Sequence, residues 1–210
     1  MTDIEISRRE RKKEETRQRI FKAAIKLFRE RGFPSTTVDD IAERADVAKG
    51  TFFNYFPRKE AVLAYLSEQR LEEAEADGAA ILAAKKPARQ KLIDLYVDAS
   101  RAWAEDRELS RYVLGELFQR EFAPAEETGR RWDDLIGRVY EQGRENGELR
   151  ADVEPVRAIS VLTSTYYALL YMWATCHDLD IDLEGEMRAR LALVLDGIAK
   201  PAAGRPSHAS

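Results

Sequence analysis

Residues 36–59, TTVDDIAERADVAKGTFFNYFPRK, constrain the fold more than any other part of the chain, because apolar residues recur there at helical spacing in two short stretches. Val38, Ile41 and Ala45 fall at i, i+3 and i+7, which predicts a helix with one buried stripe that begins near residue 38. A second helix is expected from residue 49. It must end before Pro57, because the residue before a proline disfavours the helical conformation. The segment therefore predicts two short helices joined by a tight turn.

The residues at the ends of these helices support this interpretation. Thr37 is the expected N-cap of the first helix, and Asp39 and Asp40 in the first turn suit the positive end of the helix dipole. Asp46 lies in the turn, where its short polar side chain tolerates a left-handed backbone. Val47 is apolar enough to fill the junction between the helices.

The second helix has two different faces. Phe52 and Phe56 are four residues apart and share its inner face. Another face carries Lys49, Gly50, Phe53 and Asn54. In a helix-turn-helix, the N-terminal residues of the second helix enter the major groove of DNA. The spacing alone also allows an ordinary pair of bundle helices. The candidate DNA-binding set is Thr37, Lys49, Gly50, Thr51, Phe53, Asn54, Tyr55 and Lys59.

The strings TTVDDIAERADVAKGTFFNYFPRKEAVL and, upstream, RIFKAAIKLFRERGF closely resemble the N-terminal domain of the TetR/AcrR family of bacterial transcriptional regulators. The rest of the chain resembles the family only in helical layout and length. The resemblance implies an all-α protein with a three-helix DNA-binding domain followed by a larger ligand-binding and dimerisation domain. It also implies a homodimer on a near-palindromic DNA operator and a small-molecule effector, with a repressor favoured over an activator.

Three positions depart from the usual wording of the family. Asp46 replaces the turn glycine, and Ala48 replaces a serine that would cap the second helix, at a cost of about 1 kcal/mol. Phe53 replaces a tyrosine whose hydroxyl bonds a DNA phosphate.

These departures shift the expected DNA contacts. Phe53 can still contact a thymine methyl or a sugar edge. Asn54 can pair with an adenine edge or bond the backbone, and the sequence leaves both open. Lys49 is the expected base contact. The phosphate contacts are expected from Thr51, Tyr55 and Lys59.

Charge is distributed unevenly along the chain. The formal net charge is -4, yet residues 1–60 hold 15 Lys and Arg against 11 Asp and Glu, whereas residues 61–210 hold 19 against 27. The N-terminal part is therefore the expected polyanion-facing end. A basic arm precedes the first helix and consists of Arg8, Arg9, Arg11, Lys12 and Lys13. Because Glu10, Glu14 and Glu15 are interleaved with it, a solvated charge run remains an equal alternative.

Four regions follow from the helical pattern and the resemblance. With 44% hydrophobic residues and no alternating strand pattern, the chain is expected to be all-α. The regions are a flexible basic arm at 1–10, a DNA-binding domain at 11–57, a ligand-binding and dimerisation domain at 58–199, and a disordered tail at 200–210. The expected helices beyond residues 38–56 are 11–31, 58–84, one from 87, 108–122, 125–146 and 183–199.

Aromatic residues are frequent in the predicted helices of the larger domain. They fit ordinary core packing, and they also fit the wall of the effector cavity that the family encloses there. The sequence leaves both open, and the expected effector is hydrophobic or aromatic. The candidate pocket set is Trp103, Tyr112, Phe118, Phe122, Trp132, Tyr167 and Tyr171.

Residues 158–177 carry no charged side chain, a length that would span a bilayer. Ser160, Thr163 and Ser164 make a membrane helix unfavourable, so we expect a helix buried on nearly every side. With the last helix, it is expected to form a four-helix dimer interface. The candidate dimer set is Tyr166, Leu170, Trp173, Met187, Leu191, Val194, Leu195 and Ile198.

Enzymatic activity is not expected. Cys176, His177 and Asp178 are consecutive, so on a helix their side chains diverge by about 100° and cannot form a triad. Two histidines and one cysteine are too few for a zinc site of several such ligands, and we expect no cofactor, no metal and no membrane partner. The single cysteine and the lack of a signal peptide predict a cytoplasmic protein.

Two alternatives remain from the sequence. One is a helical module that binds a small molecule or a protein without reading DNA. The other, less favoured, is an enzyme centred on Cys176 and His177.

Overall fold

The chain is all-α, as predicted. A computed structural model describes residues 8–119 and 127–198, and their backbone forms nine α-helices. In chain order these are α1 (Arg8–Arg31), α2 (Val38–Arg44), α3 (Lys49–Tyr55), α4 (Glu60–Ala83), α5 (Ala88–Ala104), α6 (Arg107–Gln119), α7 (Glu127–Glu145), α8 (Pro155–Thr175) and α9 (Leu183–Ile198).

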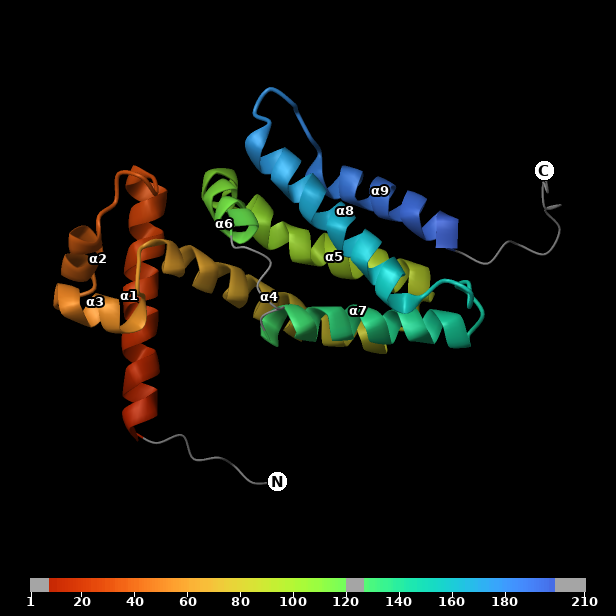
Figure 1. Cartoon of the computed structure of the whole chain (residues 1–210), viewed down its shortest axis with the longest axis horizontal. Helices are drawn as coiled ribbons and strands as arrows, with labels where there is room; N and C mark the ends of the chain where they lie inside the picture. The colour runs from red at the N-terminus through yellow and green to blue at the C-terminus, as the bar shows by residue number, and fades with distance from the viewer. Residues whose placement is uncertain (1–7, 120–126, 199–210) are drawn as a thin grey trace.

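The helices form a small head and a larger helical domain (Figure 1). The head consists of α1, α2 and α3, and α4 runs from it into the helical domain. There α5 lies at the centre, because it packs against α4, α6, α7, α8 and α9. Helix α6 lies at the end nearest the head, and α8 and α9 pack together on the side away from α4.

The head has an apolar core to which each of its helices contributes. Ile20 of α1, Ile41 of α2 and Phe52 of α3 are completely buried. The first turns of α4 complete this core, since Val62 is also buried and the Tyr65 ring lies edge-on to the head's aromatic residues. The head is therefore packed onto the start of α4.

Gly78 marks the closest approach of α4 to the rest of the helical domain. A Cβ atom at this position would lie 2.5 Å from Cδ2 of Leu135 on α7 and 3.0 Å from Cδ2 of Leu95 on α5. Both distances are shorter than van der Waals contact. A larger residue at this position would require the Leu135 and Leu95 side chains to shift.

The first helix differs from the prediction. Helix α1 begins at Arg8 rather than near residue 11, so Arg8, Arg9 and the other basic residues of the expected arm lie on its first two turns. The reason is local: the segment contains good helix formers, and Arg11 pairs with Glu15 one turn later at 3.9 Å. Residues 1–7 of the expected arm and the expected tail at 200–210 lie outside the described residues.

The uncharged segment also differs from the prediction. It forms α8, which buries one face through Leu162 and Leu169 but leaves Val161 and Tyr171 about half exposed. Proline at the first position of α8 suits a helix start, where its missing N–H is not needed. Within the described ranges, none of the helices combines the length and apolarity needed to cross a membrane.

Candidate functional site

The turn between α2 and α3 has the backbone that the sequence predicts. Asp46 has a φ of 52°, in the left-handed region, and Val47 is partly buried against the core. Thr37 caps α2: its Oγ1 accepts a hydrogen bond from the Asp40 backbone N–H, while Asp40 accepts one from the Thr37 N–H at 2.9 Å. By contrast, Ala48 gives α3 no side-chain cap. Of the two helices, α2 therefore has a complete N-terminal cap, whereas α3 has no side-chain cap.

Helix α3 presents a small exposed face. Phe52 and Phe56 are buried as expected, whereas Lys49, Gly50 and Asn54 are exposed. Phe53 is 44% exposed and rests edge-on against Phe52, with 5.5 Å between ring centroids. Two members of the predicted set, Thr51 and Tyr55, lie half-buried at the border of this face.

Lys49 is already engaged on the head surface. Its Nζ lies 2.9 Å from Oδ2 of Asp39 on α2, and both side chains are exposed. An exposed pair of this kind is worth about 1 kcal/mol or less. Lys49 can therefore exchange this partner for a base or phosphate at small cost.

Lys59 has a different environment from the one expected for a phosphate contact. Its Nζ donates hydrogen bonds of 2.8 Å to the carbonyl oxygens of Phe33 and Thr36, and it lies 4.3 Å from the centre of the Phe33 ring. These bonds fasten the α1–α2 loop to the start of α4. The sequence could not show this, because the acceptors are backbone carbonyls of a loop.

Head and helical domain are connected through α6. Arg58, just before α4, forms an ion pair with Glu116, whose side chain is 8% exposed. The ring of Phe33 packs against Tyr112 with 5.1 Å between centroids. A cavity of about 480 Å³ lies at this junction and is lined by Phe33, Tyr112 and Tyr171 among others. Helix α6 therefore makes direct side-chain contacts with the head.

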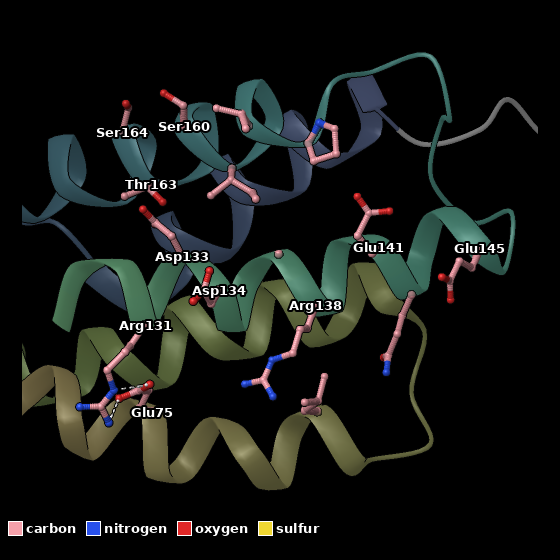
Figure 2. Close-up of a pocket in the computed structure, with 16 residues that line it drawn as sticks. Glu75, Arg131, Asp133, Asp134, Arg138, Glu141, Glu145, Ser160, Thr163 and Ser164 are labelled. Carbon is pink, nitrogen blue, oxygen red and sulfur yellow. Dashed lines mark hydrogen bonds and ion pairs between the residues drawn. The ribbon is translucent and has the colours of Figure 1, made fainter. Parts of the chain in front are cut away.

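An open groove of about 1150 Å³ runs between α7 and α8 and reaches α4 (Figure 2). Its charged residues are mostly acidic: Glu75, Asp133, Asp134, Glu141 and Glu145, against Arg131 and Arg138. Arg131 is bound to Glu75 across the groove, as the dashed lines in Figure 2 show. Burial raises the pKa of Asp133, and the neighbouring Asp134 adds to this effect. The groove is thus unfavourable for anions.

The predicted pocket residues do not line this groove and are divided among other sites. Trp103, Trp132 and Tyr167 line a small chamber in the helical domain. Tyr112 and Tyr171 line the cavity at the junction with the head. Phe118 is 57% exposed and packs on Tyr171, and Phe122 lies outside the described residues.

The chamber contains a residue that the sequence interpretation missed. Arg70 of α4 is only 7% exposed, and it faces the chamber beside Trp103. A signal was present, because Arg70 lies four and seven residues after Leu66 and Leu63, on the inward stripe of its helix.

Most of the predicted dimer residues lie inside the chain itself. Six of them are 9% exposed or less: Tyr166, Leu170, Trp173, Met187, Leu191 and Leu195. Val194 and Ile198 are partly buried. These side chains hold α8 and α9 onto each other and onto α5 and α6, so they do not form an outer face. The outer faces of the two helices instead expose Val161 and Leu193.

The residues considered for catalysis are not assembled into a site. His177 is exposed, and its Nε2 lies 3.4 Å from Oε1 of Glu108, while Cys176 contacts Thr175. In the described part of the chain, no three His, Cys, Asp or Glu side chains are grouped so as to hold a metal ion.

Comparisons with known proteins identify the class of protein that this head defines. The family model described as bacterial regulatory proteins of the tetR family matches residues 20–66. Thermus thermophilus FadR, a TetR-family transcriptional repressor whose structure was solved in complex with lauroyl-CoA, is 33% identical to the chain. That similarity covers 91% of this chain and 99% of FadR, with a TM-score of 0.76. The protein is thus a helix-turn-helix regulator, and the chain belongs to the TetR family.

Two further relatives extend the similarity. The transcriptional repressor KstR2 of Rhodococcus jostii is 26% identical over 193 residues, which cover 88% of this chain and 92% of KstR2. Bacillus subtilis FadR, whose structure was solved in complex with stearoyl-CoA, is 23% identical to the chain. The two structures superpose with a TM-score of 0.70, covering 86% of this chain and 98% of that one, and this likeness concerns the fold alone. Because TetR-family regulators are not enzymes, the catalytic alternative is set aside.

Proposed function

We propose that the chain is a homodimeric repressor that binds a near-palindromic DNA operator through α3 and is released by a small amphipathic effector. The observation that carries the DNA-binding part is the exposed face of α3, with Lys49, Gly50, Phe53 and Asn54 on a helix anchored by Phe52. Lys49 and Asn54 supply hydrogen-bonding groups for base edges, and Phe53 an apolar contact for a thymine methyl. Thr51, Tyr55 and the N-terminal basic residues of α1 are the proposed phosphate contacts.

A twofold dimer provides the second reading head. The proposed interface is the outer face of α8 and α9, where Val161 is 50% exposed and Leu193 73% exposed. Small residues between them, such as Ala168 and Ala189, are also exposed and allow close approach of a second copy. An isologous contact of this kind places the two heads symmetrically, which a near-palindromic operator requires.

An acyl thioester is the proposed effector class. The support is the 33% identity to a repressor that was solved with lauroyl-CoA, over nearly the whole of both chains. The effector acts by binding one conformation of the helical domain more tightly than the other. Its effect reaches DNA through α6, which contacts the head by way of Tyr112 and Glu116.

Selection from random duplex DNA, followed by titration at several salt concentrations, tests DNA reading. The expected result is an enriched near-palindrome whose affinity falls linearly on a log–log plot against salt. Lys49→Ala should relax base preference at one position of each half-site, by about 1–3 kcal/mol. Lys85→Ala, an exposed lysine between α4 and α5, is the matched control and should change nothing. Absence of any enriched sequence would favour the alternative of a binding module that does not read DNA.

Release of the selected DNA by lauroyl-CoA tests the effector class. Lauroyl-CoA is expected to release DNA at concentrations where coenzyme A alone has no effect. Equal effects of the two compounds would reject the acyl thioester and leave the DNA-binding proposal standing.

A further inference from the structure

A small chamber lies between helices of the helical domain, separate from the open groove. It is bounded by α4, α5, α7 and α8 and has a volume of about 20 Å³, which is room for about one water molecule. Four aromatic residues contribute to its wall: Trp103, Trp132, Tyr166 and Tyr167. Among the described residues that line it, Arg70 is the one charged side chain.

Arg70 is buried, and the part of the chain that the structure describes gives it no ion pair. Its Nη1 donates a hydrogen bond of 3.2 Å to Oγ of Ser110, and its guanidinium carbon lies 4.7 Å from the centre of the Trp103 ring. Within the described ranges no carboxylate oxygen forms an ion pair with it, although Glu105 and Asp106 act on it electrostatically and oppose the lowering of its pKa by burial. A guanidinium has five N–H groups, and a neutral hydroxyl with one aromatic face compensates little of the cost of removing this charge from water.

The charge of Arg70 nevertheless persists. Burial lowers the pKa of Arg70 to about 10, which still leaves it protonated near neutral pH. Even buried ion pairs can often be replaced by apolar side chains of similar volume without loss of stability, so a buried charge is weak evidence for a stabilising role. A buried cation of this kind is therefore better explained by what it binds than by what it stabilises.

We propose that the chamber is the binding site for a carboxylate carried by the effector, with Arg70 as its counterion and the aromatic rings around its apolar part. A planar carboxylate matches the fork of the guanidinium and can accept two parallel hydrogen bonds. The acidic groove between α7 and α8 repels the same group, so the two sites differ in the charge that they accept. This inference rests on the proposed function only in taking the helical domain as the effector-sensing domain.

The site is connected to the head through α6. Ser110, which accepts the hydrogen bond from Arg70, lies on the same helix as Tyr112 and Glu116. A carboxylate that binds Arg70 competes with Ser110 and must also enlarge the chamber, because a volume of about 20 Å³ cannot hold even a small acid. Loss of the Arg70–Ser110 hydrogen bond removes a restraint between α4 and α6 and allows a displacement of α6. The contacts of Tyr112 with Phe33 and of Glu116 with Arg58 transmit this displacement to the head.

Matched acids and amides test the proposal on the full-length protein. Isothermal titration calorimetry is carried out with benzoate and benzamide, 1-naphthylacetate and 1-naphthylacetamide, and dodecanoate and dodecanamide. In at least one pair, the acid should bind about 10-fold or more tightly than the amide, as for a hydrogen-bonded charge pair. Equal affinity of acid and amide in all three pairs overturns the proposal, whatever the shape of the natural effector.

Substitutions of Arg70 assign the preference to this chamber. Arg70→Met should abolish the acid preference while the amide affinity stays within about 3-fold, and Arg70→Lys should keep part of it, because an ammonium lacks the fork. If Arg70→Met does not fold, Arg70→Lys and Ser110→Ala decide: the first should weaken acid binding and the second should not. Arg138→Met, in the open groove, is the matched control and should leave the preference intact. An acid preference that survives in both Arg70 variants places the anion elsewhere and overturns the assignment.

The same measurements separate the source of the carboxylate and the fate of the wider proposal. A free acid and an acyl-CoA whose chain ends in a carboxylate offer the same group, so adipoyl-CoA is compared with hexanoyl-CoA in the DNA-release assay. If adipoyl-CoA releases DNA at lower concentration than hexanoyl-CoA, and this difference depends on Arg70, the carboxylate belongs to an acyl-CoA and not to a free acid. If acids bind through Arg70 but no acyl-CoA releases DNA, the proposed carboxylate site is supported and the proposed acyl thioester effector is rejected. If lauroyl-CoA releases DNA equally from wild type and Arg70→Met and no acid is preferred, the chamber fails.

Discussion

The head and the helical domain differ in what they bury. Among the described residues, the head encloses a single polar side chain other than tyrosine, Thr36, whose hydroxyl donates to the Gly32 carbonyl oxygen at 3.0 Å. The helical domain encloses Arg70, Lys91, Ser100, Ser110 and Glu116. An apolar core holds α3 in one geometry, as base reading requires, whereas a polar core contains groups whose partners can be exchanged. The contrast assigns rigidity to the head and responsiveness to the helical domain.

Phe52→Ala should produce the largest effect and separate the two regions. Truncation of this completely buried ring is expected to cost about 3–5 kcal/mol and to unfold the head. The tryptophans lie at positions 103, 132 and 173, all in the helical domain, so tryptophan fluorescence reports that region alone. Circular dichroism should show an earlier urea transition, while the fluorescence transition stays unchanged.

The matched control for this change is Phe53→Ala. Because Phe53 is 44% exposed, its truncation should leave the urea transition within about 0.5 kcal/mol and lower DNA affinity only. Coincident shifts of both signals in Phe52→Ala would show that the chain unfolds as one unit and would break the comparison.

Lys59→Ala should destabilise the head by about 1–3 kcal/mol, because it removes a charged donor from two loop carbonyls. The early circular dichroism transition in urea measures this cost. Unchanged stability with a flatter salt dependence of DNA binding would instead restore the phosphate-contact role expected from the sequence.

Arg58→Ala should weaken the link between the regions. Its partner Glu116 is almost buried on α6, so loss of the ion pair is expected to reduce effector-driven release of DNA by about 5-fold, near the lower limit of typical coupling energies. DNA affinity without effector should change less than about 3-fold. The experiment compares the release of DNA by lauroyl-CoA from wild type and from the variant. The control is Arg101→Ala, because the exposed Arg101 side chain pairs with Asp98 within the helical domain. A fall in DNA affinity alone would show that Arg58 serves the head and not the link.

Ala48→Ser should stabilise the head by about 1 kcal/mol, because a serine hydroxyl can accept from the uncapped N–H groups at the start of α3. The early urea transition should move to higher concentration without a change in the fluorescence transition. A shift of the fluorescence signal would contradict the separation of the two regions.

Asp94 should give the smallest effect, and only in the helical domain. Burial alone would raise the pKa of Asp94, but hydrogen bonds from Lys86, Gln90 and Arg188 lower it below its ordinary value of 3.8. A carboxyl whose pKa is lower in the folded state stabilises the protein above its unfolded pKa, and this stabilisation is lost as the pH falls through the folded pKa. Stability monitored by tryptophan fluorescence should therefore fall below about pH 4, by less than about 1 kcal/mol for this group. Asp94→Asn should reduce that dependence, and an unchanged profile would show that other carboxyls cause it.

The sequence predicted local geometry better than it predicted partners. Asp46 in the left-handed region and Phe52 on the inner face of α3 follow from side-chain size and helical period, which act within a few residues. The periodicity of Leu170 and Leu191 identified a buried face correctly, but it could not show that the burial occurs within the same chain.

Contacts between residues that are distant in the sequence could not be predicted from side-chain size and helical period. Lys59 is held by loop carbonyls, which have no signature in the amino-acid sequence. Arg70 lies at the spacing of a core residue, yet a charged side chain at such a position is usually solvated, and only the packing of α4, α6 and α7 shows that it is enclosed.

The contact at Gly78 gives α4 the properties of a lever. At this glycine the backbone of α4 lies against the Leu95 side chain of α5 and the Leu135 side chain of α7, so a tilt of α4 would turn about that point. Eighteen residues separate it from Glu60, about 27 Å of helix, and a tilt of about 5° there would move the first turn of α4 by about 2 Å. A tilt of α4 too small to disturb the packing around Gly78 thus produces a larger displacement of its first turn, which packs against the head.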